Sequence, residues 1–489
     1  MWLSETNKFG SKIAITDPKG SFSYQKLYQE AEKVANFLLN HFQAEHLQEK
    51  RIAFLFHSSF EYVATQWGIW LAGGLAVPLC PTHPRQEIEY VLQDADCSLL
   101  LIQNEFSPIL QEIIIPIFTY EQIENQPTIN FPDISLSQRA LIIYTSGTTG
   151  KPKGVVSTHK NIVTQIQTLV EAWQWTSQDR ILHILPLHHI HGIINALSCA
   201  LYAGAEVVFL PKFDAEKVWQ KWIAENFTIF MAVPTIYNRL ISYYEQADLP
   251  QQEAMRAACQ KMRLMISGSA ALPVSILEKW QQISGHFLLE RYGMSEMGMA
   301  ISNPLMGKRK AGMIGVPLPN VEVRLVDEQG KIVAQGEAGE IQVKGENVFL
   351  EYWQKPNATA ESFTDDGWFR TGDTALQDED GYFKILGRTS TDILKTGGYK
   401  VSAIEIEETL RQHPSIADCA VVGMPDEEWG EKVTVFLILK EQKTLNLEEL
   451  RFWAKNFLAH YKVPTQMQIV ADFPRNAMGK VMKKKLTIQ

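Results

Sequence analysis

The residues with the clearest capacity for chemistry form one loop, YTSGTTGKPKGVV, at positions 144–156. Glycines, hydroxyl residues and two lysines fill its middle, and apolar residues flank it on both sides. Glycine lets backbone N–H groups approach an anion with no side chain in between, so this composition favours phosphate binding. A kinase-like phosphoryl transfer, plain nucleotide binding and other phosphate chemistry are all compatible with the loop alone.

The loop does not match the P-loop of kinases and ATPases. That pattern is G-x-x-x-x-G-K-[ST] between a strand and a helix. Here only two residues separate Gly147 from Gly150, and Pro152 follows Lys151. ALIIY before the loop and GVVS after it both have the pattern of strands, and a helix is expected to start later, capped by Thr158. The sequence therefore predicts a loop that connects one strand to another.

The elements that position this loop follow from the periodicity of the first half of the chain. Helical patterns, such as SYQKLYQEAEKVANFLLNHF, alternate with short apolar runs, such as RIAFLF and AVPLC. This alternation predicts a largely parallel sheet with helices on its faces, that is, an α/β fold. TIFMAV, RLMIS and HFLLERY also have the pattern of strands. Ligands of such sheets collect beyond the carboxyl ends of the strands, so we expect the motifs after these strands to share one pocket.

The pattern changes beyond residue 310. NVEVRLVDEQGKIV has the pattern of a hairpin, and GEIQVKG and GYFKILG have that of short strands between glycine-rich turns. We therefore expect a small β-rich subdomain at about 310–388 within a large N-terminal domain, 1–388. A smaller α+β domain, 389–489, is expected to follow. The four consecutive polar residues that join the two domains form the predicted hinge: Thr389, Ser390, Thr391 and Asp392.

Composition limits the class of protein. At 489 residues the chain is too long for one ordinary core, so two or more domains are expected. With 45% hydrophobic and 21% charged residues it has the make-up of a soluble globular protein. The formal net charge of −9 argues against a general nucleic-acid binder. The basic stretch Lys480–Lys485 fits a solvated terminal helix and an anion site equally well.

The cysteines and the apolar runs indicate the cellular compartment of the protein. An odd number of scattered cysteines fits a reducing cytosol, with each cysteine a small core residue. The N-terminal MWLSETNKFGSK lacks the apolar core of a signal peptide, and no run approaches the roughly 18 apolar residues needed to span a bilayer. We expect a cytoplasmic protein with no membrane span and no obligatory protein partner. The five cysteines are Cys80, Cys97, Cys199, Cys259 and Cys419.

The loop and several later motifs resemble, in order, the signatures of the adenylate-forming superfamily of acyl-CoA synthetases, luciferases and adenylation domains. These motifs are SGSAALP (267–273), ERYGMSE (290–296), RTGD (370–373), LGR (386–388) and PRNAMGK (474–480). They cover nearly the whole chain, which is identified as a member of this superfamily. LPLHHIHG, MAVPTIYNRL and KTGGYKVSAIEIE are most similar to malonyl-CoA synthetases. The resemblance implies a C-terminal domain that rotates between two half-reactions.

This resemblance implies specific contacts to ATP. Asp373 is expected to accept hydrogen bonds from the ribose hydroxyls, since a carboxylate only accepts. Glu296, helped by Thr145, is the expected Mg²⁺ ligand. Lys480 is the expected catalytic lysine, which bridges the substrate carboxylate and the α-phosphate. The implied nucleotide-binding residues are Thr145, Ser146, Gly147, Thr148, Thr149, Gly150, Lys151, Lys153, Gly268, Ser269, Ala270, Ala271, Glu290, Arg291, Tyr292, Gly293, Met294, Ser295, Asp373 and Arg388.

The acid and CoA contacts are expected by the same resemblance. A second carboxylate needs a cationic partner, and Arg291 and Arg239 fall where a pocket is expected; a structural salt bridge is the alternative for each. His189 or His191, with Ser267, is expected against the acyl group, whereas His188 fits a core or capping role. The residues expected near the pantetheine arm of CoA are Gly397, Gly398 and Tyr399.

The reaction implied is ATP-dependent ligation of malonate to CoA. The carboxylate attacks the α-phosphorus of ATP and pyrophosphate leaves; the CoA thiolate then attacks the acyl carbon of malonyl-adenylate and AMP leaves. Methylmalonate or another short acid is an alternative substrate. A stand-alone adenylation protein that loads a carrier protein is a second alternative. A P-loop kinase or a non-catalytic nucleotide-binding protein is a third.

Overall fold

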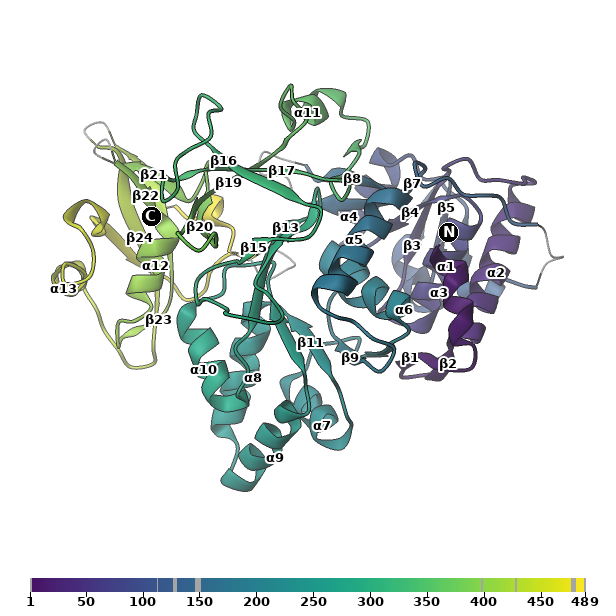
Figure 1. Ribbon diagram of the computed structural model, residues 1–489, viewed down its shortest axis with the longest axis horizontal. Helices are drawn as coiled ribbons and strands as arrows, with labels where there is room; N and C mark the ends of the chain where they lie inside the picture. The colour runs from purple at the N-terminus through teal and green to yellow at the C-terminus, as the bar shows by residue number, and fades with distance from the viewer. Residues whose placement is uncertain are drawn as a thin grey trace.

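The computed structural model describes residues 2–111, 113–125, 130–145, 151–396, 399–426, 429–475 and 481–487. Four β-sheets carry the architecture of these residues. In Figure 1 the helices and strands of the first part of the chain, in purple and blue, lie at one end of the molecule. The C-terminal elements, in yellow-green, lie at the opposite end, and the helices of the middle of the chain, in teal, extend below.

The seven-stranded sheet holds the opening loop. Its strand order is β18-β8-β7-β4-β3-β5-β6, and the pairs among β3, β4, β5, β6 and β7 are parallel. β7 and β8 pair antiparallel, with Thr145 opposite Lys153, which confirms that the loop connects two strands. The strands are β3 (Arg51–Leu55), β4 (Leu75–Pro78), β5 (Leu99–Ile102), β6 (Ile117–Thr119), β7 (Arg139–Thr145), β8 (Lys153–Thr158) and β18 (Glu351–Tyr352).

The nine-stranded sheet supplies the strand ends that sequence analysis singled out. Its order is β15-β14-β13-β12-β11-β9-β10-β1-β2, with parallel pairing from β1 through β13. Ser267, the last residue of β12, pairs with Glu290 of β13, so the residues after β12 lie beside the middle of β13. The strands are β1 (Ile13–Asp17), β2 (Gly20–Ser23), β9 (Arg180–His183), β10 (Glu206–Phe209), β11 (Ile229–Ala232), β12 (Leu264–Ser267), β13 (Leu289–Met294), β14 (Gly298–Ser302) and β15 (Val316–Pro317).

Helices pack on these two sheets, as the alternating pattern predicted. Local signals set their starts: α5 begins after Thr158, whose side chain accepts from Asn161 N–H while the Asn161 side chain accepts from Thr158 N–H. The cap predicted at Thr158 is confirmed. The helices of this part are α1 (Trp2–Glu5), α2 (Tyr24–His41), α3 (Phe60–Leu71), α4 (Arg85–Asp94), α5 (His159–Ala172), α6 (Cys199–Ala203), α7 (Ala215–Ala224), α8 (Pro234–Gln246), α9 (Leu249–Gln260) and α10 (Val274–Ser284), with the π-helix η4 (His191–Ser198) and the 3₁₀ turns η1 (Thr6–Phe9), η2 (Asn104–Leu110) and η3 (Tyr120–Gln122).

A four-stranded antiparallel sheet, with order β16-β17-β19-β20, forms the β-rich part. The residues that were read as the second strand of a hairpin form only an isolated bridge, Val326 to Ile332, and β16 pairs with β17 instead. The pairing of β19 with β20 places Asp373 opposite Arg388. The elements are β16 (Glu322–Val326), β17 (Gly339–Lys344), α11 (Pro356–Glu361), β19 (Phe369–Gln377) and β20 (Phe383–Arg388).

The C-terminal elements pack around a core of their own, which includes Ile406 and Val435. The hairpin expected around TGGYKVS joins β21 to β22, and β24 pairs with β21, β23 and β25. The last predicted helix ends at Ala454, four residues before the end of its apolar pattern. The elements are β21 (Ile393–Thr396), β22 (Tyr399–Ser402), α12 (Ala403–Leu410), β23 (Ile416–Asp426), β24 (Gly430–Leu439), α13 (Leu447–Ala454), η5 (His460–Lys462), β25 (Gln466–Ile469) and η6 (Lys483–Lys485).

The cysteines and the helices can be compared with the expectations from composition. All five cysteines are buried and free, as small core residues are. Within the described part of the chain, no helix combines the length and the apolar character that a bilayer crossing requires. The expectation of a solvated terminal helix is wrong for Lys483, which lies on the 3₁₀ turn η6 with a side chain only 16% exposed.

Candidate active site

Arg291 is a buried cation in the middle of β13, next to Glu290, which pairs with Ser267 at the end of β12. Its residue exposure is 2%, and its Nη2 atom donates to the hydroxyl of Ser269 at 3.4 Å. Among the described residues, its Nε and Nη1 atoms have no hydrogen-bond partner. Burial lowers the pKa of Arg291 to about 9, so the side chain remains charged at neutral pH. A buried guanidinium with unpaired N–H groups is costly by itself, and an anionic ligand would satisfy it.

The neighbouring Glu290 does not neutralise this cation at pH 7. Burial raises the pKa of Glu290 to about 8, so the carboxyl is mostly protonated there. Its Oε1 atom accepts a hydrogen bond from the backbone N–H of Leu272 at 3.3 Å. The local charge is therefore positive, which favours a negatively charged substrate group.

The histidine motif converges on the same place. His191 opens the π-helix η4, and its Nδ1 lies 3.1 Å from the Ser269 hydroxyl, while its Nε2 has no partner among the described residues. Burial and the nearby Arg291 lower the pKa of His191, so its ring is neutral. The Ser267 hydroxyl is also buried and unpaired within the described chain. π-Helical turns are frequent at functional sites, and here one places a neutral imidazole close to the Arg291 guanidinium.

The other two histidines of the motif lie beside this group. The rings of His188 and His189 are 4.1 Å apart, and burial lowers the pKa of His189 to about 4. The Nε2 of His189 is unpaired among the described residues. Neutral rings and unpaired polar atoms suit contact with an uncharged part of an acyl group.

The SGSAA loop places backbone next to the arginine. Ser269 has φ +69°, in the left-handed region that residues other than glycine rarely adopt. Such strain often accompanies a functional site. Gly268 lies against the Arg291 guanidinium, whereas Ala270 and Ala271 are exposed. The loop thus supplies accessible backbone beside a fixed cation.

A second group of residues surrounds Glu296. Gly293 and Met294 pair with Met299 and Gly298, and the chain turns between them through Ser295 and Glu296. This hairpin presents Glu296 at the edge of the site. A cavity of about 10 Å³, the size of one water, lies beside Ser295 and Gly298.

Glu296 is held by an aromatic residue that the sequence analysis missed. Tyr352 donates its hydroxyl to Oε1 of Glu296 at 2.9 Å, and the Lys153 ammonium lies 4.9 Å from the centre of the Tyr352 ring. The hydroxyl of Thr145 donates to the Lys153 carbonyl at 3.5 Å. Burial raises the pKa of Glu296. Tyr352 is brought to Glu296 because β18 pairs with β8, where Tyr352 lies opposite Val155. A single sequence does not show this pairing, so it could not identify Tyr352 as a site residue.

The donors around Glu296 fit a magnesium ion that is shared with phosphates. Mg²⁺ binds hard oxygen ligands and typically takes one or two carboxylates, with substrate phosphates and water completing its shell. Glu296 supplies the carboxylate and Thr145 a hydroxyl. Among the described residues, no group of three or more His, Cys, Asp or Glu side chains could hold a metal by itself. The donor set therefore suits Mg²⁺ delivered with a nucleotide.

Asp373 forms the third group, with two partners. The Tyr292 hydroxyl donates to its Oδ2 at 2.6 Å, and Nε of Arg388 lies 3.0 Å from its Oδ1. Arg388 also donates to the carbonyl of Thr371 at 2.8 Å. This fixed, acceptor-only carboxylate can accept two hydrogen bonds from a vicinal diol.

Several other predicted residues lie apart from these three groups, or outside the residues that the structure describes. Arg239 is exposed on α8, and its guanidinium lies 6.0 Å from the centre of the Phe213 ring. Lys151 lies 5.4 Å from the centre of the Tyr90 ring, and Tyr399 stacks on Tyr461 at 4.1 Å. The predicted residues outside the described ranges are Ser146, Gly147, Thr148, Thr149, Gly150, Gly397, Gly398 and Lys480.

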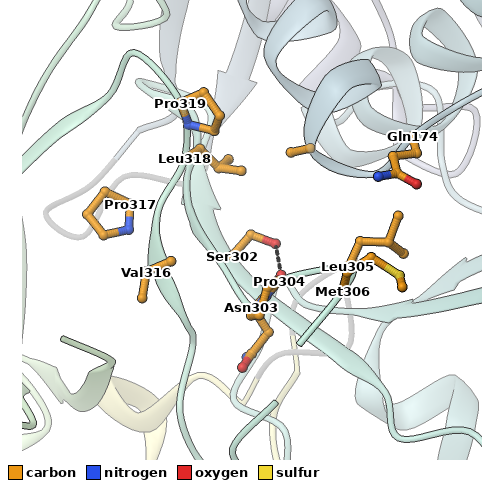
Figure 2. A pocket seen from close by; sticks show the side chains of 11 residues that line it. Gln174, Ser302, Asn303, Pro304, Leu305, Met306, Val316, Pro317, Leu318 and Pro319 are labelled. Atoms are coloured by element: carbon orange, nitrogen blue, oxygen red, sulfur yellow. Dashed lines mark hydrogen bonds between the residues drawn. The ribbon is translucent and has the colours of Figure 1, made fainter. Parts of the chain in front are cut away.

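A separate cleft of about 270 Å³ is lined mainly by residues 302–306 and 316–319 (Figure 2). Its wall includes Ser302, the β14 residue opposite Arg291, whose hydroxyl donates to the Asn303 carbonyl at 2.8 Å. Gln174 faces Leu305 and Met306 across the opening in Figure 2. None of the predicted site residues lines this cleft. The Arg291, Glu296 and Asp373 groups, and not this cleft, are therefore the candidate active site.

Comparison with known proteins identifies the family of the chain. The family model "AMP-binding enzyme" matches residues 4–353, and "AMP-binding enzyme C-terminal domain" matches 405–480. The chain is 45% identical to the mitochondrial malonate–CoA ligase ACSF3 of Xenopus laevis, over 99% of this chain and 91% of that one. ATP-bound MatB from Rhodopseudomonas palustris superposes with a TM-score of 0.89 at 34% identity, covering 99% and 98% of the two chains. O-succinylbenzoate CoA synthetase (MenE) of Bacillus subtilis, bound to ATP and magnesium, superposes with a TM-score of 0.87 at 27% identity, covering 99% and 98%.

Proposed function

Because the chain belongs to the family of AMP-binding enzymes, we propose that it is an ATP-dependent malonate–CoA ligase. Its products are malonyl-CoA, AMP and pyrophosphate. Two kinds of evidence support the substrate: the 45% identity to a malonate–CoA ligase over nearly the whole chain, and the buried, unpaired guanidinium of Arg291. Arg291 carries the argument, because a monocarboxylate that reacts through its only carboxylate has no charge left for this cation.

The first half-reaction uses the three groups in different roles. One carboxylate of malonate attacks the α-phosphorus of ATP, and pyrophosphate leaves. Asp373 holds the ribose, and the backbone around Gly268 and the 144–154 loop hold the phosphates. Magnesium, when bound, neutralises phosphate charge, and Glu296 with Thr145 would hold it. We propose Lys480 as the cation that brings the attacking carboxylate and the α-phosphate together.

Arg291 binds the other carboxylate of malonate. A charge-assisted hydrogen bond is worth about 1.5–3 kcal/mol, and a guanidinium can make two in parallel. His191 and Ser269 fix the arginine side of the pocket, and we propose that His189 contacts the methylene carbon. Arg239 is retained as a second candidate for the carboxylate, although its exposed side chain lies apart from Arg291.

The second half-reaction transfers the acyl group. The CoA thiolate attacks the acyl carbon of malonyl-adenylate, the C–O bond to phosphate breaks, and AMP leaves. We propose that 389–489 rotates about Thr389–Asp392 relative to 1–388 between the two steps. Gly397, Gly398 and Tyr399 would then line the path of the pantetheine arm.

We also propose a reducing compartment for the enzyme, since its five cysteines are all buried and free. The cytoplasm is our proposal, although the Xenopus laevis relative is mitochondrial. Fluorescent tagging of the protein in its own cell distinguishes the two locations.

A product analysis with a panel of acids tests the function. Malonate, methylmalonate and acetate are each supplied with ATP, Mg²⁺ and CoA, and pyrophosphate, AMP, ADP and thioester are measured. We expect pyrophosphate, AMP and thioester with malonate, and turnover of acetate lower by at least about 10²-fold, since the pocket cation stays unpaired. Preferential turnover of methylmalonate would reassign the substrate. ADP formation, or thioester formation on a carrier protein but not on CoA, would overturn the proposal.

A further inference from the structure

Lys483 is buried between two carboxylates. Its Nζ lies 2.6 Å from Oδ1 of Asp392 and 2.7 Å from Oε1 of Glu407. The side chains of these three residues are 16%, 14% and 8% exposed, respectively. A buried ion pair is held firmly, because removal of one partner leaves an uncompensated charge in a poorly solvated place. Lys483 is therefore fixed to the hinge residue Asp392 and to helix α12.

Asp392 contacts both sides of the hinge. One carboxylate oxygen accepts from Lys483 of the tail, and the other accepts from the backbone N–H of Arg388 at 3.0 Å. The Asp392 carbonyl accepts from the N–H of Ala403, the first residue of α12, at 2.7 Å. A single side chain thus connects the last strand of the β-rich sheet to the C-terminal tail.

The described residues on either side of 476–480 are also tied together. Arg475 and Val481 form an antiparallel bridge, and the N–H of Met482 donates to the carbonyl of Pro474 at 2.7 Å. Arg475 pairs with Asp418 at 3.0 Å. The described residues immediately before and after 476–480 are therefore held against each other.

A second arginine joins this anchor to Lys483. Arg411 lies 3.3 Å from a carboxylate oxygen of Asp418 and 3.5 Å from one of Glu407. Glu407 in turn holds Lys483. The charges form one continuous path from Arg475, before the segment, to Lys483, after it, and on to the hinge.

We propose that Lys483 is a positioning residue, which fastens the end of the segment that carries Lys480 to the hinge carboxylate Asp392. This inference rests on the proposed function, in which Lys480 serves the first half-reaction. Three residues of chain span at most about 11 Å, so Lys480 is tethered close to Lys483. Displacement of a reacting group by about 1 Å can cost about 10²-fold in rate, so loosening this tether should slow the first half-reaction selectively.

Separate assays of the two half-reactions test this role. Malonate-dependent ATP–pyrophosphate exchange reports the first, and malonyl-CoA formation from supplied malonyl-adenylate reports the second. For Lys483→Met we expect exchange to fall by at least about tenfold, with thioester formation kept within about twofold. The matched control is Lys485→Met, an exposed lysine on the same 3₁₀ turn, which should leave both rates within about twofold of the native values.

A second variant tests the same interaction in case Lys483→Met does not fold. Asp392→Asn breaks the link to the hinge but leaves Glu407 to pair with Lys483, and we expect the same selective loss of exchange. In the double variant the two losses should not multiply, because both remove one interaction. Lys483→Arg, which keeps the cation, should recover part of the exchange rate.

The outcomes separate this inference from the proposed function. Equal losses in both half-reactions, together with a lower Tm, would show a structural role for Lys483 and overturn the inference. Unchanged exchange in both single variants would overturn it as well. A native enzyme that makes no malonyl-CoA would instead refute the proposed function, and the two half-reactions would then be compared with the acid that it does activate.

Discussion

The guanidinium of Arg291 lies directly against the backbone of Gly268: a β-carbon at position 268 would stand 2.5 Å from both Cζ and Nη1 of the arginine. Gly268 directly follows β12, and Arg291 lies in the neighbouring parallel strand β13, next to Glu290, which pairs with Ser267. A side chain at 268 would occupy the space that the cation now fills. The glycine of the SGSAA motif therefore leaves room for the arginine that we propose to bind the second carboxylate of the acid.

Gly268→Ala should displace the arginine. We expect the KM for malonate to rise by about tenfold or more, because at least one charge-assisted hydrogen bond to the substrate is lost or lengthened. Steady-state kinetics with malonate as the varied substrate measure this. An unchanged KM for malonate with a raised KM for ATP would assign Gly268 to the nucleotide alone.

Arg291→Met should abolish the preference for a diacid. The kcat/KM for malonate is expected to fall by about 10²-fold or more, while that for acetate does not fall, since acetate has no second carboxylate. Without bound ligand, the Arg291→Met variant should also have a higher Tm than the native enzyme, because the substitution removes a buried cation with unpaired donors. Competition between the two acids and thermal unfolding measure both effects.

Two further arginines make this experiment decisive. Arg239→Met tests the second candidate, and Arg256→Met, on the exposed face of α9, is the control. If preference for malonate survives in the Arg291 variant and is lost in the Arg239 variant, the assignment of the carboxylate partner is wrong.

Tyr352→Phe should weaken the response to magnesium. Removal of the hydroxyl that donates to Glu296 leaves the carboxylate less well oriented, and loss of such a supporting hydrogen bond typically costs about 10- to 100-fold in metal affinity or activity. The Mg²⁺ concentration for half-maximal pyrophosphate release is the measurement. The control is Tyr382→Phe, whose hydroxyl donates to the Lys308 carbonyl. Equal Mg²⁺ dependence in the two variants would contradict a role for Tyr352.

The stability of the free enzyme should depend on pH through Glu290. Burial raises its pKa from an ordinary value of 4.5 to about 8 in the folded protein. The folded state therefore holds a proton that the unfolded chain releases, and the resulting stability is complete below pH 4.5 and is lost as the pH rises towards about 8.

Glu290→Gln should remove this slope. Relative to the native protein, the variant gains up to about 1.4 kcal/mol of stability for each pH unit within that window. Thermal or urea unfolding from pH 5 to 9 measures the difference. Parallel profiles of the two proteins would mean that Glu290 is ionised in the folded state.

Lys480→Ala should separate the half-reactions. We expect adenylate formation to fall by about 10²-fold or more, because a positioned cation at developing phosphate charge is lost. Thioester synthesis from supplied malonyl-adenylate should continue. Pyrophosphate exchange and thioester formation are measured in parallel, and losses of equal size would contradict the two-conformation scheme.

The sequence alone determined the order of the elements and the chemistry of the loops. The strands on both sides of the opening loop, the cap at Thr158 and the strand that ends at Ser267 were all predicted, because periodicity and capping are properties of neighbouring residues. The family followed from motifs in a fixed order.

Only the tertiary structure decided which residues meet. The Ser269 hydroxyl reaches His191 across 78 positions of sequence, Tyr352 reaches Glu296 across 56, and Lys483 reaches Asp392 across 91. A local pattern shows which face of a strand is buried. Sheet register and packing, however, determine which residues from other elements contact that face. For that reason Arg291 was a candidate in the sequence, and became a buried cation with unpaired donors only once β12, β13 and the π-helix were in place.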